Sequence, residues 1–162
     1  MTPAQLTTLK AGIAAETDPV FVTYRLGRST GSMADWYSLT DPAFVVYKTN
    51  VSLNQVGDNI VSTELAGLSS LNATRLQTIA QYSTNGVNPS LADRRAFFDD
   101  VFSGIGGALT RAKLLILWKR FALRGEKLFA TGTGTGTDAA PATLGFEGRI
   151  TNSDVLAALG GT

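Results

Sequence analysis

Residues 108–129 read ALTRAKLLILWKRFALRGEKLF and carry the strongest helical pattern in the chain. At about 100° of rotation per residue, one broad side of this predicted helix is apolar: Leu114, Leu117, Trp118, Phe121, Ala122, Leu128 and Phe129. A second apolar sector holds Leu109, Ala112, Ile116 and Leu123. A helix that is apolar on two sides is normally central in a fold or covered again in an oligomer. We therefore expect a mainly α fold, with a helical domain built around one long helix.

Four cations lie between these two apolar sectors, within about 60° of arc: Lys113, Arg120, Arg124 and Lys127. One interpretation is a solvated basic edge on a core helix. The other is an interface with an acidic subunit surface or with DNA, where the guanidinium forks of Arg120 and Arg124 suit carboxylate or phosphate. Arg94 poses a similar choice on the preceding helix, where it either extends its charged end to water or joins an interface ion pair.

The segment upstream of this stretch predicts a second packed helix over residues 90–103, capped by Ser90 and ended by the glycines at 104, 106 and 107. Its apolar positions recur at helical spacing. Together with the following helix they give the predicted core: Phe97, Phe98, Val101, Phe102, Leu114, Leu117, Trp118 and Phe121. Adjacent Asp99 and Asp100 diverge by about 100° on a helix, so we interpret them as a solvated face and not as a catalytic pair.

Several further helix starts are marked by capping residues. Thr2-Pro3 and Asp18-Pro19 each predict a start, because proline is tolerated in a first helical turn. Ser52 with Gln55 and Thr151 with Asp154 fit capping boxes, and another helix begins at Ser69 or Ser70. A short helix is expected around 33–38, and residues 43–48 (AFVVYK), β-branched and aromatic, are expected to be extended.

The C-terminal quarter combines a low-complexity segment with a predicted strand. Residues 131–137 read TGTGTGT, a composition typical of a flexible arm. A phosphate-binding loop is rejected, because it needs a strand before it and a helix after it. Residues 143–151 alternate like a half-buried strand, with Leu144, Phe146 and Ile150 on one face. We expect a helical domain over 1–130 and an arm over 131–162, which either belongs to the same domain or reaches a neighbour. The strand pairs with residues 43–48 or, as we favour, with a neighbouring subunit.

Composition excludes several classes of function. The 162 residues have a formal net charge of +1 and contain no cysteine and no histidine. Disulfides and thiolate metal sites are therefore excluded, and the commonest general base and transition-metal ligand is missing. The first residues lack the pattern of a signal peptide, and no apolar run is long enough to span a membrane. We expect no enzyme activity, no cofactor and no membrane partner.

The order of several motifs resembles a group of tailed-bacteriophage structural proteins. The motifs are FVVYKTNVS at 44–52, RGEKLFATGTGT at 124–135 and PATLGFEG at 141–148. The resemblance covers nearly the whole chain and implies a head, neck or tail component of the virion, assembled in the host cytoplasm, without catalytic residues. It names no functional residue.

Within that group we favour a head-to-tail connector that assembles as a homo-oligomeric ring beside portal or tail proteins. Packaged DNA is a further candidate partner, at the predicted basic stripe. The candidate interface residues are Arg94, Lys113, Arg120, Arg124, Lys127, Leu144, Phe146 and Ile150. A capsid-decorating or tail protein is the first alternative. A small DNA-binding regulator is the second, and it would need a recognition helix within 108–129.

Overall fold

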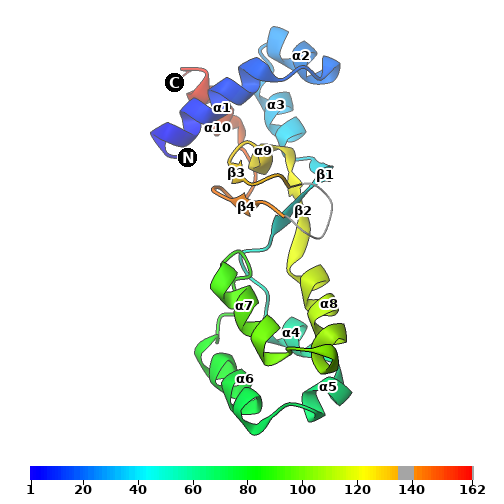
Figure 1. The fold of residues 1–162 in the computed structure, drawn as a ribbon. Helices are drawn as coiled ribbons and strands as arrows, with labels where there is room; N and C mark the ends of the chain where they lie inside the picture. The colour runs from blue at the N-terminus through cyan, green and yellow to red at the C-terminus, as the bar shows by residue number, and fades with distance from the viewer. Residues whose placement is uncertain (135–140, 162) are drawn as a thin grey trace. The chain divides into compact units, whose positions relative to one another are not determined.

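The structure is a computed structural model that describes residues 1–134 and 141–161. In this part of the chain it contains ten α-helices and short strands (Figure 1), so the predicted mainly α fold with a small β element near the C-terminus is confirmed. The described residues form two compact units. Unit 1 comprises 1–46, 121–134 and 141–161, and unit 2 comprises 47–120. The expected division at residue 130 does not coincide with this one.

Unit 1 contains two terminal helical segments and the short strands between them. Its helices are α1 (Pro3–Ala15), α2 (Pro19–Leu26), α3 (Thr30–Tyr37), α9 (Arg124–Lys127) and α10 (Asn152–Ala158). Strands β3 (Ala130–Thr131) and β4 (Thr143–Leu144) pair in antiparallel register. The chain leaves unit 1 within β1 (Thr40–Tyr47) and returns within β2 (Lys119–Leu123), and these two strands form a second sheet.

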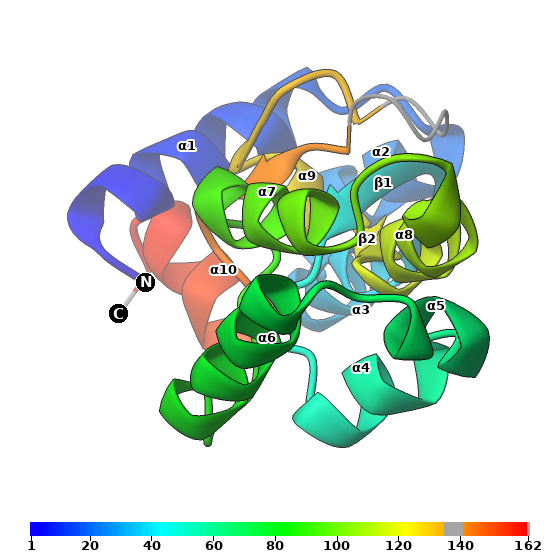
Figure 2. The ribbon, with the colours of Figure 1, turned by 60° about the horizontal axis from the view of Figure 1, so that its bottom comes forward.

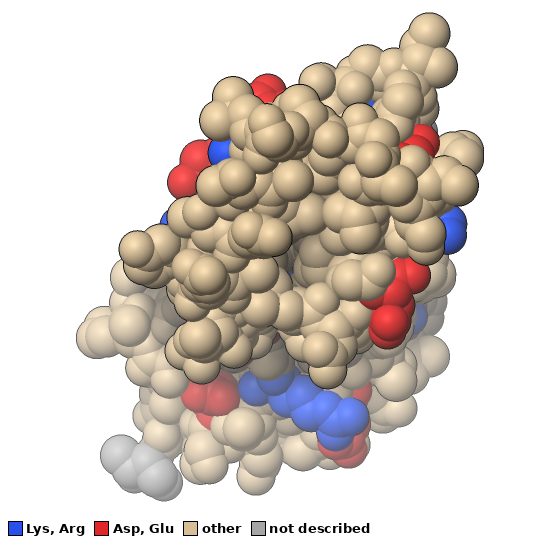
Figure 3. Space-filling view, turned by 90° about the horizontal axis from the view of Figure 1, so that it is seen from below, with Lys and Arg blue, Asp and Glu red and all other residues tan. Residues whose placement is uncertain are grey.

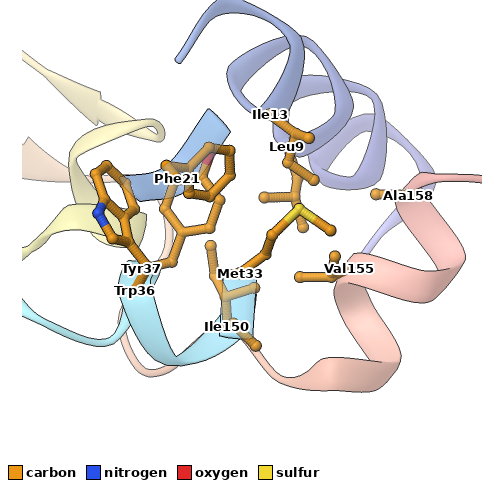
Figure 4. Close-up of a cluster of buried hydrophobic side chains, with 10 residues drawn as sticks. Leu9, Ile13, Phe21, Met33, Trp36, Tyr37, Ile150, Val155 and Ala158 are labelled. Atoms are coloured by element: carbon orange, nitrogen blue, oxygen red, sulfur yellow. The ribbon is translucent and has the colours of Figure 1, made fainter. Parts of the chain in front are cut away.

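The core of unit 1 joins the two ends of the chain. α10 packs against both α1 and α3. Figure 4 shows their buried side chains converging, with Met33 of α3 between Leu9 of α1 and Val155 of α10. Phe21, Trp36 and Tyr37 extend this core with ring centroids 4.7–5.1 Å apart. Unit 1 therefore needs residues 141–161 to complete its core.

Unit 2 is a set of short helices around a second apolar cluster. They are α4 (Leu53–Asn59), α5 (Ser62–Ala66), α6 (Ser70–Tyr82), α7 (Ala92–Val101) and α8 (Ala108–Leu117), with the 3₁₀ turn η1 (Ile105–Gly107) before α8. α4 packs on α8 and α6 on α7 (Figure 2). The cluster holds Val51, Val56, Val87, Phe98, Val101, Phe102, Leu114 and Trp118.

The predicted helix starts are largely confirmed. The side chains of Thr2, Asp18, Ser52, Ser69 and Thr151 each accept a hydrogen bond from a backbone amide in the following turn. In three of these places a full capping box forms, because the residue three positions on bonds back to the cap amide. Such caps satisfy amides that have no partner inside the helix. The expected Ser90 cap does not form; α7 begins one residue later, after Leu91.

The prediction of a single long helix over 108–129 is wrong. α8 ends at Leu117, residues 119–123 are strand β2, and α9 is a separate single turn. Strand pairing with β1 replaces helical hydrogen bonds there: the Lys48 amide donates to the Trp118 carbonyl at 2.8 Å. Tertiary pairing commonly overrides local helix propensity. The helix faces that were predicted for residues after Leu117 are therefore wrong as well.

The predicted core is correct up to this break. Phe98, Val101, Phe102, Leu114 and Trp118 are buried, and Phe97 and Leu117 are half-buried. The predicted burial of Phe121 is wrong, because the residue is 53% exposed. The next residue, Ala122, is fully buried. In a strand, successive side chains point to opposite faces, so Ala122 takes the inward position that the helical wheel gave to Phe121.

The C-terminal strand is shorter than predicted and finds its partner in its own chain. Only Thr143–Leu144 is strand, and it pairs with Ala130–Thr131. The Ala142 amide donates to the Val45 carbonyl of β1. Of the two predicted partners, the segment 43–48 of the same chain is in contact through the bridge between Val46 and Ala142, and pairing with a neighbouring subunit stays a prediction. Residues 135–140 of the predicted arm lie outside the described part of the chain.

Replacing Phe98 by alanine should lower the free energy of unfolding by about 3–5 kcal/mol, because it leaves a cavity in the unit 2 core. Phe121→Ala should cost about 1 kcal/mol or less, since half of the ring is already in water. Urea unfolding of both variants measures the difference. Equal losses would contradict the break of the helix at Leu117.

Candidate functional site

Helix α8 presents an apolar face to solvent in unit 2. Ile105 of η1 is 96% exposed, Leu109 63% and Ile116 69%. Leu109, the exposed Ala112 and Ile116 follow one another at intervals of three and four residues, which places them on one side of α8. We call this row of three residues the α8 stripe; Ile105 lies in the turn before it. The stripe is the second apolar sector of the sequence prediction up to Ile116, and Leu123, the remaining member, lies in β2.

The opposite face of α8 fixes the helix in unit 2. Leu114 and Trp118 are buried in the core, and the Thr110 hydroxyl accepts a hydrogen bond from the Val61 amide at 3.0 Å. The Glu64 carboxylate of α5 accepts from the amides of Leu109 and Thr110, at 3.0 and 2.8 Å. A carboxylate at a helix N-terminus satisfies free amides and opposes the helix dipole. We call this contact the Glu64 clamp.

The clamp perturbs the ionisation of Glu64. Desolvation opposes the charged form, but hydrogen bonds from Thr110 and Leu109 and the charge of Arg111 outweigh it and lower the pKa of Glu64. Arg111 itself donates to the carbonyls of Phe102 and Gly104. The two charged side chains near the start of α8, Glu64 and Arg111, thus form their hydrogen bonds inside unit 2.

The surface of α4, α5 and α6 carries little charge. Residues 49–92 contain only three Asp, Glu, Lys or Arg residues, namely Asp58, Glu64 and Arg75. These helices come forward when the molecule is turned to show its lower side (Figure 2). In the space-filling view from below, Lys, Arg, Asp and Glu form separate patches on a mostly tan surface (Figure 3). Depletion of charge is a compositional signal of the centre of protein interfaces.

The predicted basic stripe does not form, because its four residues belong to three different elements. Lys113 is on α8, Arg120 is in β2, and Arg124 and Lys127 are on α9. The Arg124 guanidinium lies 4.3 Å from the Trp36 ring centroid, and Lys127 Nζ is 2.9 Å from Asp41 Oδ2. Of the four cations, only Arg124 and Lys127 share one site.

Arg124 and Lys127 line a cavity of about 470 Å³ in unit 1, together with Glu16, Asp18 and Asp41. Desolvation acts against the charge on Asp41, yet the hydrogen bonds from Lys127 and the Ala43 amide prevail and hold the pKa of Asp41 below its usual value. The positive charges here are balanced by carboxylates. The cavity therefore offers no net basic surface to an anionic partner.

The other interface candidates lie elsewhere. Arg94 is exposed on α7, and its nearest ion-pair partner is Asp93 at 4.0 Å. Ile150 is buried in the unit 1 core, and Leu144 and Phe146 are half-buried. The Phe146 ring lies 5.2 Å from the ring of Phe129. These three apolar residues therefore contribute to the packing of unit 1, and their role at an interface stays a prediction.

Glu126 is a structural residue that the sequence interpretation missed. It is 1% exposed, and its carboxylate accepts from the amides of Leu123 and Gly148, at 2.8 and 3.0 Å. It thereby holds α9 against the turn after β4. Glu126 follows Leu123 by three residues, which is the spacing of a capping box. This spacing is the feature of the sequence that could have identified its role.

The described residues offer little acid–base or metal chemistry. They contain no group of three or more carboxylates that could hold a metal ion. The buried Tyr37 hydroxyl has no hydrogen-bond partner among them. Burial, with a contribution from the Glu16 charge, raises the pKa of Tyr37 far above its ordinary value, so the phenol stays protonated.

Comparison with known proteins gave no match: no family model, no curated protein and no solved structure is similar to this chain. Among the described helices, none has the length and hydropathy that crossing a membrane requires.

The Glu64 clamp predicts an acid-sensitive contribution to stability. A lowered pKa means that the contribution is present above the unfolded-state value, about 4.3, and is lost as the pH falls below it. Glu64→Gln should therefore destabilise the protein more at about pH 7 than at about pH 3. Thermal unfolding across this range, with Asp58→Asn as the carboxyl-to-amide control, measures it. A penalty for Glu64→Gln that does not change with pH would rule the clamp out.

Proposed function

We propose that this protein is a non-enzymatic structural subunit of a bacteriophage particle that assembles with copies of itself, with a head-to-tail connector ring as the favoured position. The observation that carries the proposal is the α8 stripe. The motifs at 44–52, 124–135 and 141–148, which resemble phage structural proteins, supply the setting. Neighbouring portal or tail components are the expected further partners.

The energetics of the stripe favour a protein partner. Full burial of one leucine or isoleucine side chain stabilises a complex by about 1.5–3 kcal/mol. Association itself costs about 4–15 kcal/mol in lost freedom of motion. The two large side chains of the stripe, Leu109 and Ile116, therefore do not hold two proteins together alone. The sparsely charged surface of the neighbouring helices α4, α5 and α6 is suited to extend the contact.

A small DNA-binding regulator is less well supported. α8 would be its recognition helix, because α7 and a glycine turn precede it. Its outward face carries Leu109 and Ile116, whereas base edges and phosphates are read mainly by polar and basic side chains. Arg111 is turned inward to backbone carbonyls. A capsid-decorating or tail protein would use the same apolar face, so it stays the alternative within the virion class.

Mass measurement of the purified protein and of intact phage particles tests the proposal. The protein should be oligomeric and should be present in the particles at a fixed copy number. The double variant Leu109→Gln, Ile116→Gln should fold but lose self-association, because both side chains are exposed in the single subunit. Leu26→Gln is the matched control, since Leu26 is 79% exposed on α2 and is not part of the stripe. A monomer that is absent from particles would refute the proposal.

A further inference from the structure

A small apolar groove in unit 1 has the features of a receptor for the α8 stripe. It lies at α2 and α3, has a volume of about 230 Å³ and is lined by Val20, Tyr24, Ser32, Asp35, Trp36 and Leu39. Val20 and Leu39 are 53% and 52% exposed. We call it the α2–α3 groove. It combines an apolar lining with one carboxylate, that of the exposed Asp35.

The α8 stripe carries the complementary charge. Lys113 follows Leu109 by four residues and precedes Ile116 by three, so it lies beside both on the same side of α8. It is exposed. Among the described residues neither Lys113 nor Asp35 forms an ion pair. Each surface therefore presents apolar groups and one unpaired charge, and the two charges are opposite.

We propose that the α8 stripe of one copy docks into the α2–α3 groove of a second copy, with Lys113 paired to Asp35. The inference rests on the proposed self-assembly and names the two surfaces that meet. Apolar side chains of the stripe enter the groove between Val20 and Leu39. The Lys113–Asp35 pair sets the register of the helix in the groove.

Charge argues against two other arrangements. Two α8 stripes packed on each other about a twofold axis would bring two copies of Lys113 together without a carboxylate between them. A larger cavity of about 590 Å³ in unit 1, at Leu156 and Leu159, is edged by Arg25 and Arg28, which would repel Lys113. Like charges placed together across an interface cost affinity and exclude wrong partners.

A contact between two different surfaces is heterologous. Each copy carries one stripe and one groove, so every added copy leaves one of each surface free and the contact repeats until it closes into a ring or continues as a filament. The inference therefore gives the proposed connector ring a concrete head-to-tail contact.

Charge reversal provides the test. Lys113→Glu and Asp35→Lys each place like charges in the contact and should raise the dissociation constant of self-association about tenfold or more. An equimolar mixture of the two variants should recover association, because every contact between unlike copies again joins one lysine to one carboxylate. The double variant should recover it alone, with the two charges exchanged. Light scattering with size-exclusion chromatography measures each sample.

Matched controls separate this contact from general effects. Lys10→Glu on α1 and Asp99→Lys on α7 reverse exposed charges outside both surfaces and should leave association unchanged. Circular dichroism checks that every variant folds. All four positions are exposed, so folding should be preserved.

The outcomes distinguish this inference from the proposed function. A wild-type chain that stays monomeric overturns both. Self-association that neither reversal weakens overturns the head-to-tail contact and leaves self-assembly standing. Weakening by both reversals without recovery in the mixture shows that the two charges do not meet between copies, and it overturns the pairing.

Discussion

Pairing of β2 with β1 determines how much of the central stretch is helix. Without a partner strand, residues 119–123 have the propensity and spacing to continue α8. The strand β1 supplies the backbone partners of β2. The other edge of β1 is also paired: the Val45 amide donates to the Gly134 carbonyl, and the Val45 carbonyl accepts from the Ala142 amide. An unpaired sheet edge would be an open template for other chains. Since α8 stops at Leu117, its inner face ends at Trp118 in the unit 2 core and its outer face remains a short, separate surface.

The segment after β2 is held by buried contacts that leave no room for variation. Gly125 is buried, and a side chain there would come within 2.6 Å of Ile150 and 3.2 Å of the Tyr37 carbonyl. Next to it, the buried Glu126 carboxylate bonds two amides from separate segments. Buried carboxylates are tolerated where hydrogen bonds replace the lost water. Gly125 and Glu126 thus fix α9, and with it the position of Arg124 over Trp36.

Local signals in the sequence were reliable where local chemistry decides the structure. Helix starts at Thr2, Asp18 and Ser52 follow from a side chain and amides a few residues away. The outer face of α8 follows from helical periodicity between Leu109 and Ile116. The break after Leu117 does not, because it depends on a strand more than seventy residues earlier in the chain. The same long-range pairing places Lys113, Arg120 and Arg124 on three different elements. The basic stripe, which was predicted on the assumption of one helix, therefore does not form.

The candidate site was visible in the sequence only in part. The α8 stripe was recognisable as a second apolar sector, whereas the α2–α3 groove depends on how two short helices pack. The stripe contributes little to unit 2, whose core uses the other face of α8, and exposed apolar rows on a helix favour association. Polar residues at Leu109 and Ile116 would suit an isolated subunit better. The charge of Lys113 would weaken a purely apolar contact unless the partner placed an anion beside it. The need for this anion makes the contact selective. An apolar row with one embedded charge therefore favours a partner that is apolar and bears one carboxylate, and the chain itself carries such a surface at Asp35.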